Sequence, residues 1–168
     1  MKKIRIEKVV LIIGCGTNYP IENAKKILEE VSGKKAIVVK TKRRSTFGVT
    51  KGKEIGCKVT IRKNTKEFLK RILEAKEKLE ESNFDDTGNL SFGIKEYIDV
   101  PGMEYDPSIA ITGFDVSVTL ERPGYSIKRR KIAGKIGKGH LIKKEEAIEF
   151  IRKEFGVKVR EHGQKESN

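Results

Sequence analysis

The sequence predicts an α+β fold of two layers, in which helices cover one face of a mostly antiparallel sheet and the opposite face stays open and polar. Two stretches, residues 57–62 and 112–121, alternate apolar and polar side chains, as a strand with one buried face does. Three others, residues 20–33, 64–82 and 143–155, repeat apolar side chains at helical spacing. Because the strands keep one polar face, the helices are expected to pack on the other.

The chain is expected to begin with a strand from Ile4 to Ile13, followed by a helix from Pro20 to Gly33. The strand becomes continuously apolar from Val9 to Ile13, which is typical of a central strand. The turn Gly14-Cys15-Gly16 then interrupts it. Proline is favoured in the first turn of a helix and glycine just past its end, so these two residues mark the helix boundaries. The apolar face of this helix consists of Ile21, Ala24, Leu28 and Val31.

Two further strands are expected at residues 36–40 and 57–62, joined by a basic loop at residues 42–56. Three glycines and a high density of Lys and Arg argue against a packed element in this loop. In the second strand the inward side chains are Cys57, Val59 and Ile61, and the outward ones are Lys58, Thr60 and Arg62.

The second helix is expected to start at Asn64, with Glu67 completing a capping box, and to end near Ser82. Its buried stripe consists of Phe68, Leu69, Ile72, Leu73 and Leu79. A short strand should follow at residues 91–95. In the strand at 112–121 the inner face consists of Phe114, Val116, Val118 and Leu120, and the outer face of Asp115, Ser117, Thr119 and Glu121.

The last helix is expected from Lys143 to Phe155, and residues 160–168 are expected to form a frayed tail. A length of 168 residues suits one domain, residues 1–168. Within it stand the basic loop 42–56, a basic segment at residues 122–144 and the tail.

Positive charge is concentrated in two segments. Residues 34–63 carry eleven Lys or Arg and one acidic residue, and residues 122–144 carry nine and none. The whole chain is only +13, so everything outside these segments nets −6. Clustered charge of this kind is typical of a nucleic-acid binder, because neutralising phosphates releases counterions. The alternative is that both segments only aid solubility.

Composition excludes several classes of protein. No apolar run approaches the length of a membrane span, and residues 1–8 lack the apolar stretch of a signal peptide, so a cytoplasmic protein without membrane partners is the default expectation. The two cysteines, Cys15 and Cys57, stand in apolar strand-like runs. We therefore expect small core residues rather than a zinc site or a disulfide.

Motifs that would indicate an enzyme are incomplete, and no cofactor is expected. Gly14-Cys15-Gly16 lacks the third glycine of a dinucleotide-binding loop, because Tyr19 occupies that place. The two histidines, His140 and His162, have no nucleophile nearby in sequence. Asp85-Asp86 is better explained as a turn than as a metal site, although a hard cation is the alternative there.

Several long motifs stand out in the sequence: the strand and turn from Ile6 to Gly16, the stretch from Thr41 to Arg62, Phe84-Asp85-Asp86-Thr87-Gly88-Asn89-Leu90-Ser91-Phe92-Gly93-Ile94, Tyr105-Asp106-Pro107 and the run from Gly113 to Gly124. Together these motifs resemble the family of ribosomal protein L five, which binds 5S rRNA in the large subunit. The similarity runs over roughly residues 4–158, and the segment 125–140 resembles the archaeal and eukaryal branch. The sequence departs from the family at Ile12, where many members carry Asn, and at Thr17, where Glu is common.

The resemblance implies a non-enzymatic, structural protein of the central protuberance. Its partners would be 5S rRNA, large-subunit rRNA, neighbouring large-subunit proteins, P-site tRNA and, at an intersubunit bridge, small-subunit protein S thirteen. The expected rRNA contacts are Lys8, Lys58, Thr60, Arg62, Ser117, Thr119, Lys128, Arg129 and Arg130, on the open sheet face and the second basic segment. The expected tRNA contacts, on the first basic loop, are Lys42, Arg43, Arg44, Ser45, Thr46, Phe47, Gly48 and Lys51.

Two competing functions remain open at this stage. The first is a KH-like regulator of single-stranded RNA, because Gly134-Lys135-Ile136-Gly137 matches the GxxG loop of KH domains. That function would require a helix directly before the loop, where Pro123-Gly124-Tyr125 makes one improbable. The second is a nucleotide-dependent enzyme acting on RNA, which would need a complete glycine fingerprint or clustered acids and bases.

Overall fold

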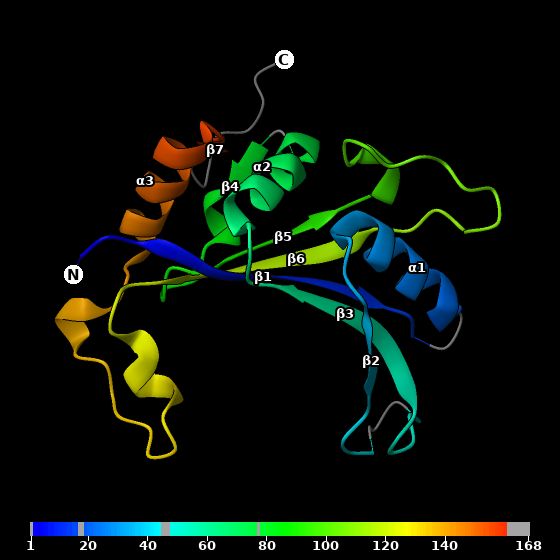
Figure 1. Ribbon diagram of the computed structural model, residues 1–168, viewed down its shortest axis with the longest axis horizontal. Helices are drawn as coiled ribbons and strands as arrows, with labels where there is room; N and C mark the ends of the chain where they lie inside the picture. Colours follow the sequence, from blue (N-terminus) through cyan, green and yellow to red (C-terminus); the bar gives the residue numbers. More distant parts are fainter. Residues whose placement is uncertain (1, 17–18, 45–47, 77, 161–168) are drawn as a thin grey trace. The chain divides into compact units, whose positions relative to one another are not determined.

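The structure is a computed structural model that describes residues 2–16, 19–44, 48–76 and 78–160 (Figure 1). Five strands form one sheet in the order β2-β3-β1-β6-β5, and β4 pairs with β7 in a two-stranded parallel sheet. The five-stranded sheet is mostly antiparallel, so the predicted α+β class is confirmed. Its strands are β1 (Arg5–Gly14), β2 (Ile37–Lys40), β3 (Glu54–Ile61), β5 (Leu90–Ile94) and β6 (Phe114–Glu121).

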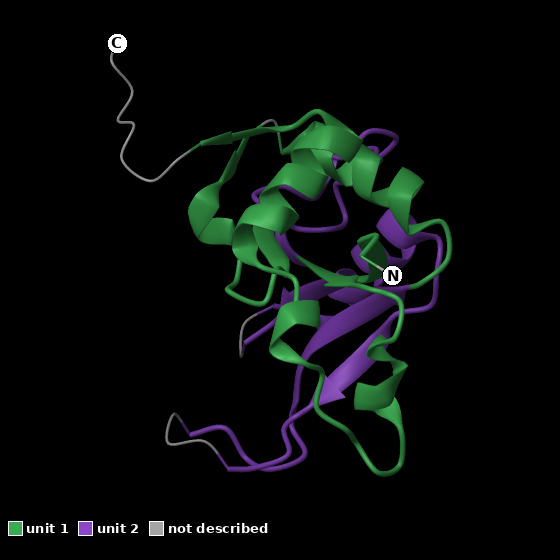
Figure 2. Ribbon diagram, turned by 90° about the vertical axis from the view of Figure 1, so that its left-hand side faces the viewer, with its two compact units in different colours: residues 1–9, 62–92, 117–168 green, residues 10–61, 93–116 purple. Residues whose placement is uncertain are grey.

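The chain divides into two compact units (Figure 2). Unit 1 comprises residues 1–9, 62–92 and 117–168, and unit 2 comprises residues 10–61 and 93–116. Helix α1 (Ile21–Ser32) belongs to unit 2, whereas α2 (Thr65–Ala75) and α3 (Lys144–Phe155) belong to unit 1. Each unit has buried apolar side chains of its own. The single domain expected from the length of the chain stays a prediction.

In unit 2, helix α1 packs against β3 and β2, as its predicted apolar face requires. Its buried residues are Ala24, Ile27, Leu28 and Val31, so the predicted face missed Ile27, and Ile21 is only half-buried. Gly33 ends the helix in the left-handed conformation, with a φ of 62°, and its N–H donates to the carbonyl of Glu29. A side chain would be strained in that conformation, which is why glycine terminates the helix here.

Strand β3 begins at Glu54, so the prediction that the loop extends to residue 56 was wrong. Gly56 is not a loop glycine: a Cβ built on it would lie 2.3 Å from the carbonyl oxygen of Ile13. The glycine therefore permits a close approach of β3 to the end of β1. Beyond it the predicted alternation holds, because Cys57, Val59 and Ile61 are buried and Lys58 is exposed.

Strand β1 lies at the centre of the sheet order, but only one of its faces is fully buried. Val9, Leu11 and Ile13 are buried, whereas Ile12 is 38% exposed. The prediction of a central strand is confirmed, although continuous apolar sequence does not here mean that both faces are buried. On the face that carries Ile12, the described elements do not exclude water from this side chain.

Helix α2 ends at Ala75 and not near Ser82. Leu79 continues the helical spacing of apolar residues, but it lies in β4 (Lys78–Glu80), where it is the one buried residue of three. The predicted capping box is absent, because Asn64 adopts a left-handed conformation and its side chain makes no capping hydrogen bond. Strand β4 pairs with β7 (Lys158–Arg160), so Arg160 belongs to a strand, and residues 161–168 of the predicted tail lie outside the described residues.

The two cysteines behave as small core residues. Both are free and buried, and burial raises the pKa of each thiol above its ordinary value. The thiols therefore stay protonated near neutral pH, and a protonated thiol is a poor nucleophile and a poor metal ligand. This finding agrees with the interpretation made from sequence.

Replacing Gly56 by alanine is expected to destabilise the protein by about 1–3 kcal/mol, the usual cost of forcing extra volume into a packed site. The melting temperature should fall by roughly 2–4 °C for each kcal/mol in a domain of this size. Gly139→Ala is the matched control, because nothing lies within 4 Å of a Cβ at that position. Equal melting temperatures for the two variants would show that β3 does not approach β1 this closely.

Candidate nucleic-acid interface

Each of the two units carries some of the residues predicted for the polar sheet face. In unit 2, Lys58 is exposed and Thr60 half-buried on β3. In unit 1, Ser117 and Thr119 are half-buried on β6, and Arg62 is exposed just after β3. The Ser117 hydroxyl lies 3.2 Å from that of Ser91 on β5, so this hydroxyl already has a partner.

Lys8 is less available than its sequence position indicates. Its side chain is 32% exposed, and its Nζ atom lies 4.0 Å from the carboxylate of Glu7. Lys8 belongs to unit 1. Any contribution to RNA binding would therefore have to compete with this carboxylate.

The first basic loop, residues 41–53 of unit 2, is closed at its base by hydrogen bonds, and we call this closed base the neck. The Thr41 N–H donates to the carbonyl of Lys53, and the Gly52 N–H donates to the carbonyl of Thr41, both at 2.9 Å. The Thr41 hydroxyl also donates to the carbonyl of Thr50 at 2.7 Å. Beyond this neck the exposed side chains are Lys42, Arg43, Arg44 and Lys51, with Gly48 alongside. Three predicted tRNA contacts, Ser45, Thr46 and Phe47, lie outside the described residues.

The second basic region contains two short 3₁₀ helices, η3 (Tyr125–Arg129) and η4 (Lys138–His140). We call residues 125–141 the η3–η4 segment. The Tyr125 hydroxyl holds its two ends together, because it donates to the carbonyl of His140 at 3.0 Å and accepts from the N–H of Ile142 at 3.2 Å. The His140 ring packs edge-on against Tyr125, and its Nε2 atom lies 2.9 Å from the carbonyl oxygen of Pro123. This segment is therefore anchored at its base.

The three predicted contacts at residues 128–130 are not equivalent. Arg129 forms ion pairs with Glu121 and, at 3.4 Å, with Glu7. Lys128 and Arg130 are exposed and form no ion pair with a described residue. Of these three residues, Lys128 and Arg130 therefore have the charge that is available to phosphate.

Glu121 was expected on the polar face of its strand, but it is only 4% exposed. Two guanidinium groups explain this burial. Arg129 contacts one carboxylate oxygen, and Arg5 contacts the other at 2.6 Å. A buried carboxylate needs partners of this kind to remain charged.

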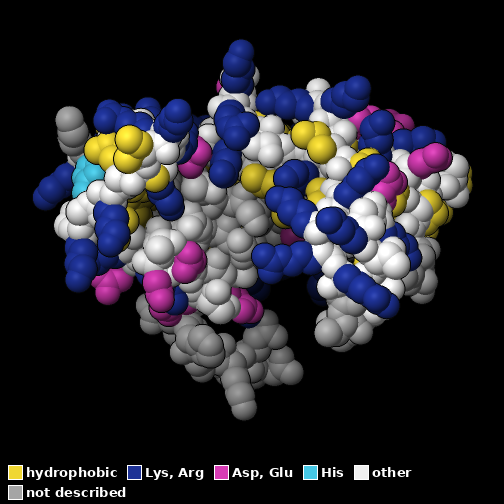
Figure 3. All heavy atoms as spheres, turned by 90° about the horizontal axis from the view of Figure 1, so that it is seen from below, with side chains coloured by type: hydrophobic (Ala, Val, Ile, Leu, Met, Phe, Trp, Pro, Cys, Tyr) yellow, Lys and Arg dark blue, Asp and Glu magenta, His cyan; other side chains and the backbone are white. Residues whose placement is uncertain are grey.

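Exposed aliphatic side chains lie among the cations of the η3–η4 segment, and the sequence analysis missed them. Ile127 is 40% exposed, Ile132 is 89% exposed, and Leu141 is 39% exposed. Figure 3 shows yellow side chains surrounded by dark blue ones at the left, where this segment lies in Figure 1. The signal in the sequence was their position in a stretch without any acidic residue. Such a surface can pack on sugars or bases while its cations contact phosphates.

The structure does not support the KH-like alternative. The GxxG motif at residues 134–137 follows the five-residue 3₁₀ helix η3 and precedes the three-residue η4. Between β6 and α3, where every residue is described, no α-helix flanks this motif. A KH domain clamps its ligand between two helices, and that arrangement is missing from this stretch.

The remaining motifs have structural explanations. The Cys15 N–H donates to the carbonyl of Ile55, so the glycine turn ends a paired strand. The Thr87 hydroxyl and the Asn89 amide donate to the carboxylate of Asp85, and these bonds lower the pKa of Asp85. Within the described residues no group of three or more His, Cys, Asp or Glu side chains could hold a metal ion. The helices of this part of the chain are also too short or too polar to cross a membrane.

Comparison with known proteins gives one consistent family. The model that describes the C-terminus of the ribosomal L five family matches residues 54–150. A protein of Nitrosopumilus maritimus named "Large ribosomal subunit protein uL5" is 49% identical over 164 residues, which cover 95% of each chain. Proteins of the same name from Cenarchaeum symbiosum and Sulfurisphaera tokodaii are 46% and 43% identical, over 95% of this chain and 97% and 93% of theirs.

Arg129→Ala is expected to lower mainly the stability of the protein, and Arg130→Ala mainly its affinity for RNA. Arg129→Ala removes one partner of the buried Glu121 and should cost about 1–2 kcal/mol of stability, less than a fully buried pair because Arg129 is half exposed and Arg5 remains. Arg130→Ala should leave stability within about 0.5 kcal/mol. It should weaken RNA binding and lower the slope of log affinity against log salt by roughly 0.7–0.9.

Thermal unfolding would measure the stability of both variants, and RNA binding at several salt concentrations would measure their salt slopes. The assignment would be wrong if Arg130→Ala destabilised the protein as much as Arg129→Ala, or if neither changed the salt slope.

Proposed function

Because this chain belongs to the uL5 family of ribosomal proteins, we propose that it binds 5S rRNA and helps to attach that RNA to the large subunit in the central protuberance. The family is structural and non-enzymatic. The chain therefore has a structural role in the large ribosomal subunit, with rRNA and neighbouring proteins as partners. Its relatives are of the archaeal type.

The observation that carries the 5S rRNA proposal is the concentration of positive charge. Two segments hold charges of +10 and +9 in a chain whose total is +13. In unit 1, the anchored base of the η3–η4 segment fixes the ends of a stretch that presents exposed cations and aliphatic side chains. In unit 2, the outward residues Lys58 and Thr60 stand on a strand whose other face is buried. A preformed cationic surface binds RNA with less loss of conformational entropy than a disordered one.

We assign the first basic loop to P-site tRNA, as the family resemblance implies. Its cations project beyond the closed neck at Thr41, so they can reach an RNA without disturbing β2 or β3. Lys40 and Glu54 form an ion pair of 3.2 Å next to the neck. The loop is therefore anchored to the strands of unit 2 and free to contribute charge to a separate RNA molecule.

A third surface suits protein partners such as small-subunit protein S thirteen at an intersubunit bridge. The loop of unit 2 at residues 95–113 carries four acidic residues and one Lys, the reverse of the basic segments. Within it, Tyr105 is 58% exposed and Ile111 is 53% exposed. Acidic side chains repel phosphate and attract a basic protein, and apolar side chains beside them can pack on that protein. The buried Tyr97 anchors this loop, because its hydroxyl accepts from the N–H of Asp106.

Binding of 5S rRNA is expected to weaken steeply with salt. If about five phosphates are neutralised, affinity should fall roughly 100- to 500-fold between about 50 and 200 mM salt. Filter binding or fluorescence anisotropy with labelled 5S rRNA would measure the slope, and an unrelated hairpin RNA of equal length would serve as the control. A flat salt dependence, or equal affinity for both RNAs, would overturn the proposal.

The double variant Arg43→Gln with Arg44→Gln is expected to weaken tRNA retention in the P site by roughly two- to thirty-fold, from about 0.2–1 kcal/mol for each exposed charge contact. Binding to 5S rRNA and incorporation into subunits should change much less, because Lys58 and Arg62 and all nine cations of residues 122–144 remain. The matched control is Lys34→Gln with Lys35→Gln, which removes two exposed charges from the turn after α1. A loss of 5S rRNA binding in the first variant, or equal tRNA effects in both, would contradict the assignment of this loop.

A further inference from the structure

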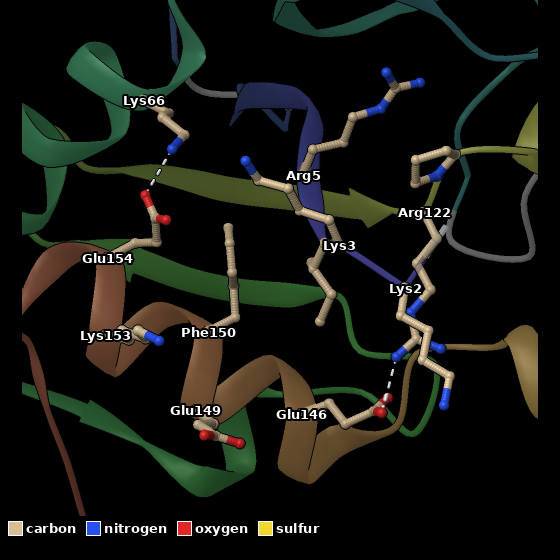
Figure 4. A pocket seen from close by; sticks show the side chains of 12 residues that line it. Lys2, Lys3, Arg5, Lys66, Arg122, Glu146, Glu149, Phe150, Lys153 and Glu154 are labelled. Atoms are coloured by element: carbon tan, nitrogen blue, oxygen red, sulfur yellow. Dashed lines mark hydrogen bonds and ion pairs between the residues drawn. The ribbon is translucent and has the colours of Figure 1, made fainter.

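A groove of about 800 Å³ lies within unit 1, between the residues that lead into β1 and the exposed face of α3 (Figure 4). None of the residues predicted to bind RNA lines it. The apolar lining consists of Ile4, Pro123 and Phe150. A groove of this size is large enough for one or two side chains of a partner.

Two ion pairs bracket the apolar centre of this groove. At one end Arg122 contacts Glu146 at 2.8 Å, and at the other Lys66 contacts Glu154 at 2.6 Å. The two glutamates stand four residues before and after Phe150, so all three lie on one face of α3. Figure 4 shows the Phe150 ring between the two pairs.

Both glutamates of these pairs remain charged. The Lys143 N–H lowers the pKa of Glu146, with Arg122 adding to the effect. The hydrogen bond from Lys66 lowers the pKa of Glu154. The two ion pairs therefore hold the ends of the groove in place, and the Phe150 ring between them stays accessible.

The groove carries more positive than negative charge, although Lys3 and Lys153 are both close enough to Glu154 to help lower its pKa. Six of its lining residues are Lys or Arg and three are Glu. Arg5 is already paired with Glu121. Lys2, Lys3 and Lys153 form no ion pair with a described residue, and neither does Glu149. An anionic group with an apolar neighbour would therefore complement this surface.

We propose that this groove is a docking site for a segment of a neighbouring large-subunit protein in which an apolar side chain stands next to acidic residues. The apolar side chain packs on Phe150 and Ile4. The acidic residues lie against Lys2, Lys3 and Lys153. This inference concerns a protein partner and goes beyond RNA binding. It rests on the proposed function in one respect, because the partner is expected to be a neighbour in the large subunit.

RNA is the less suitable occupant. A base could stack on Phe150, but its phosphates would lie near three glutamates. Helix α3 as a whole carries four acidic and three basic residues. A protein segment can place a backbone N–H or a basic residue beside Glu149, whereas a phosphate chain cannot.

Photo-crosslinking in assembled subunits tests the proposal. Phe150 is replaced by p-benzoylphenylalanine in cells in which this is the only copy of the protein, and purified large subunits are irradiated. The expected product is a crosslink to one ribosomal protein, at a peptide that mass spectrometry shows to carry an apolar residue beside Asp or Glu. The same replacement at Phe68, on α2 and outside the groove lining, is the positional control.

Charge variants of the labelled protein complete the design. Lys153→Glu should lower the crosslink yield about 2–5-fold, the range for one exposed ion pair, whereas Lys70→Glu on α2 should not. A crosslink to rRNA, a peptide without acidic residues, or no crosslink would overturn the proposal. Incorporation of the labelled protein into subunits is measured separately, so that failure of the ribosomal function is distinguished from failure of the docking site.

Discussion

Two oppositely charged neighbours at the end of β6, Glu121 and Arg122, organise unit 1. Each is 4% exposed, and charges are buried to this extent only when they are paired. Glu121 accepts from Arg5, just inside β1, and from Arg129 in η3. Arg122 contacts Glu146 on α3 and donates weakly to the carbonyls of His140 and Leu141. Four separate stretches of the chain thus converge on two adjacent residues, and removing either charge would remove the contacts that hold these stretches together.

This arrangement separates the charges that maintain the fold from those available to partners. Arg5 pairs with Glu121, and Arg129 pairs with both Glu121 and Glu7, so these two cations contribute less to the field outside the protein than unpaired ones. Lys128 and Arg130 remain exposed beside them. The groove of unit 1 and the acidic loop at residues 95–113 of unit 2 suit proteins, whereas the basic segments suit RNA. A ribosomal protein that contacts both kinds of partner needs such a division, because one surface cannot attract phosphates and acidic peptides selectively at once.

Much of the fold could be predicted from the sequence where the periodicity is simple. The predicted inner residues of β6 and three of the four predicted for α1 are buried, and Gly33 ends its helix, whereas Ile21 is half-buried and the buried Ile27 was not predicted. The errors arose where a tertiary contact overrides a local pattern. Leu79 fits a helical stripe but is buried in a short strand, and Gly56 resembles a loop residue although it allows two strands to approach. The burial of Glu121 depends on Arg5, and one ion pair of Arg129 depends on Glu7. Neither could be predicted, because these partners lie more than a hundred positions away in the sequence.

The central claim is that the η3–η4 segment is ordered before it meets 5S rRNA and is then covered by it. Hydrogen–deuterium exchange of the free protein and of its 5S rRNA complex measures both parts at once. The amides of His140 and Ile142 should be protected in the free protein, because the first donates to the carbonyl of Gly137 and the second to the Tyr125 hydroxyl. Protection across residues 125–141 should rise further on RNA binding, while the acidic loop at 95–113 should not change. Exchange of this segment at the rate of an unfolded chain in the free protein, or exchange that 5S rRNA leaves unaltered, would contradict the account.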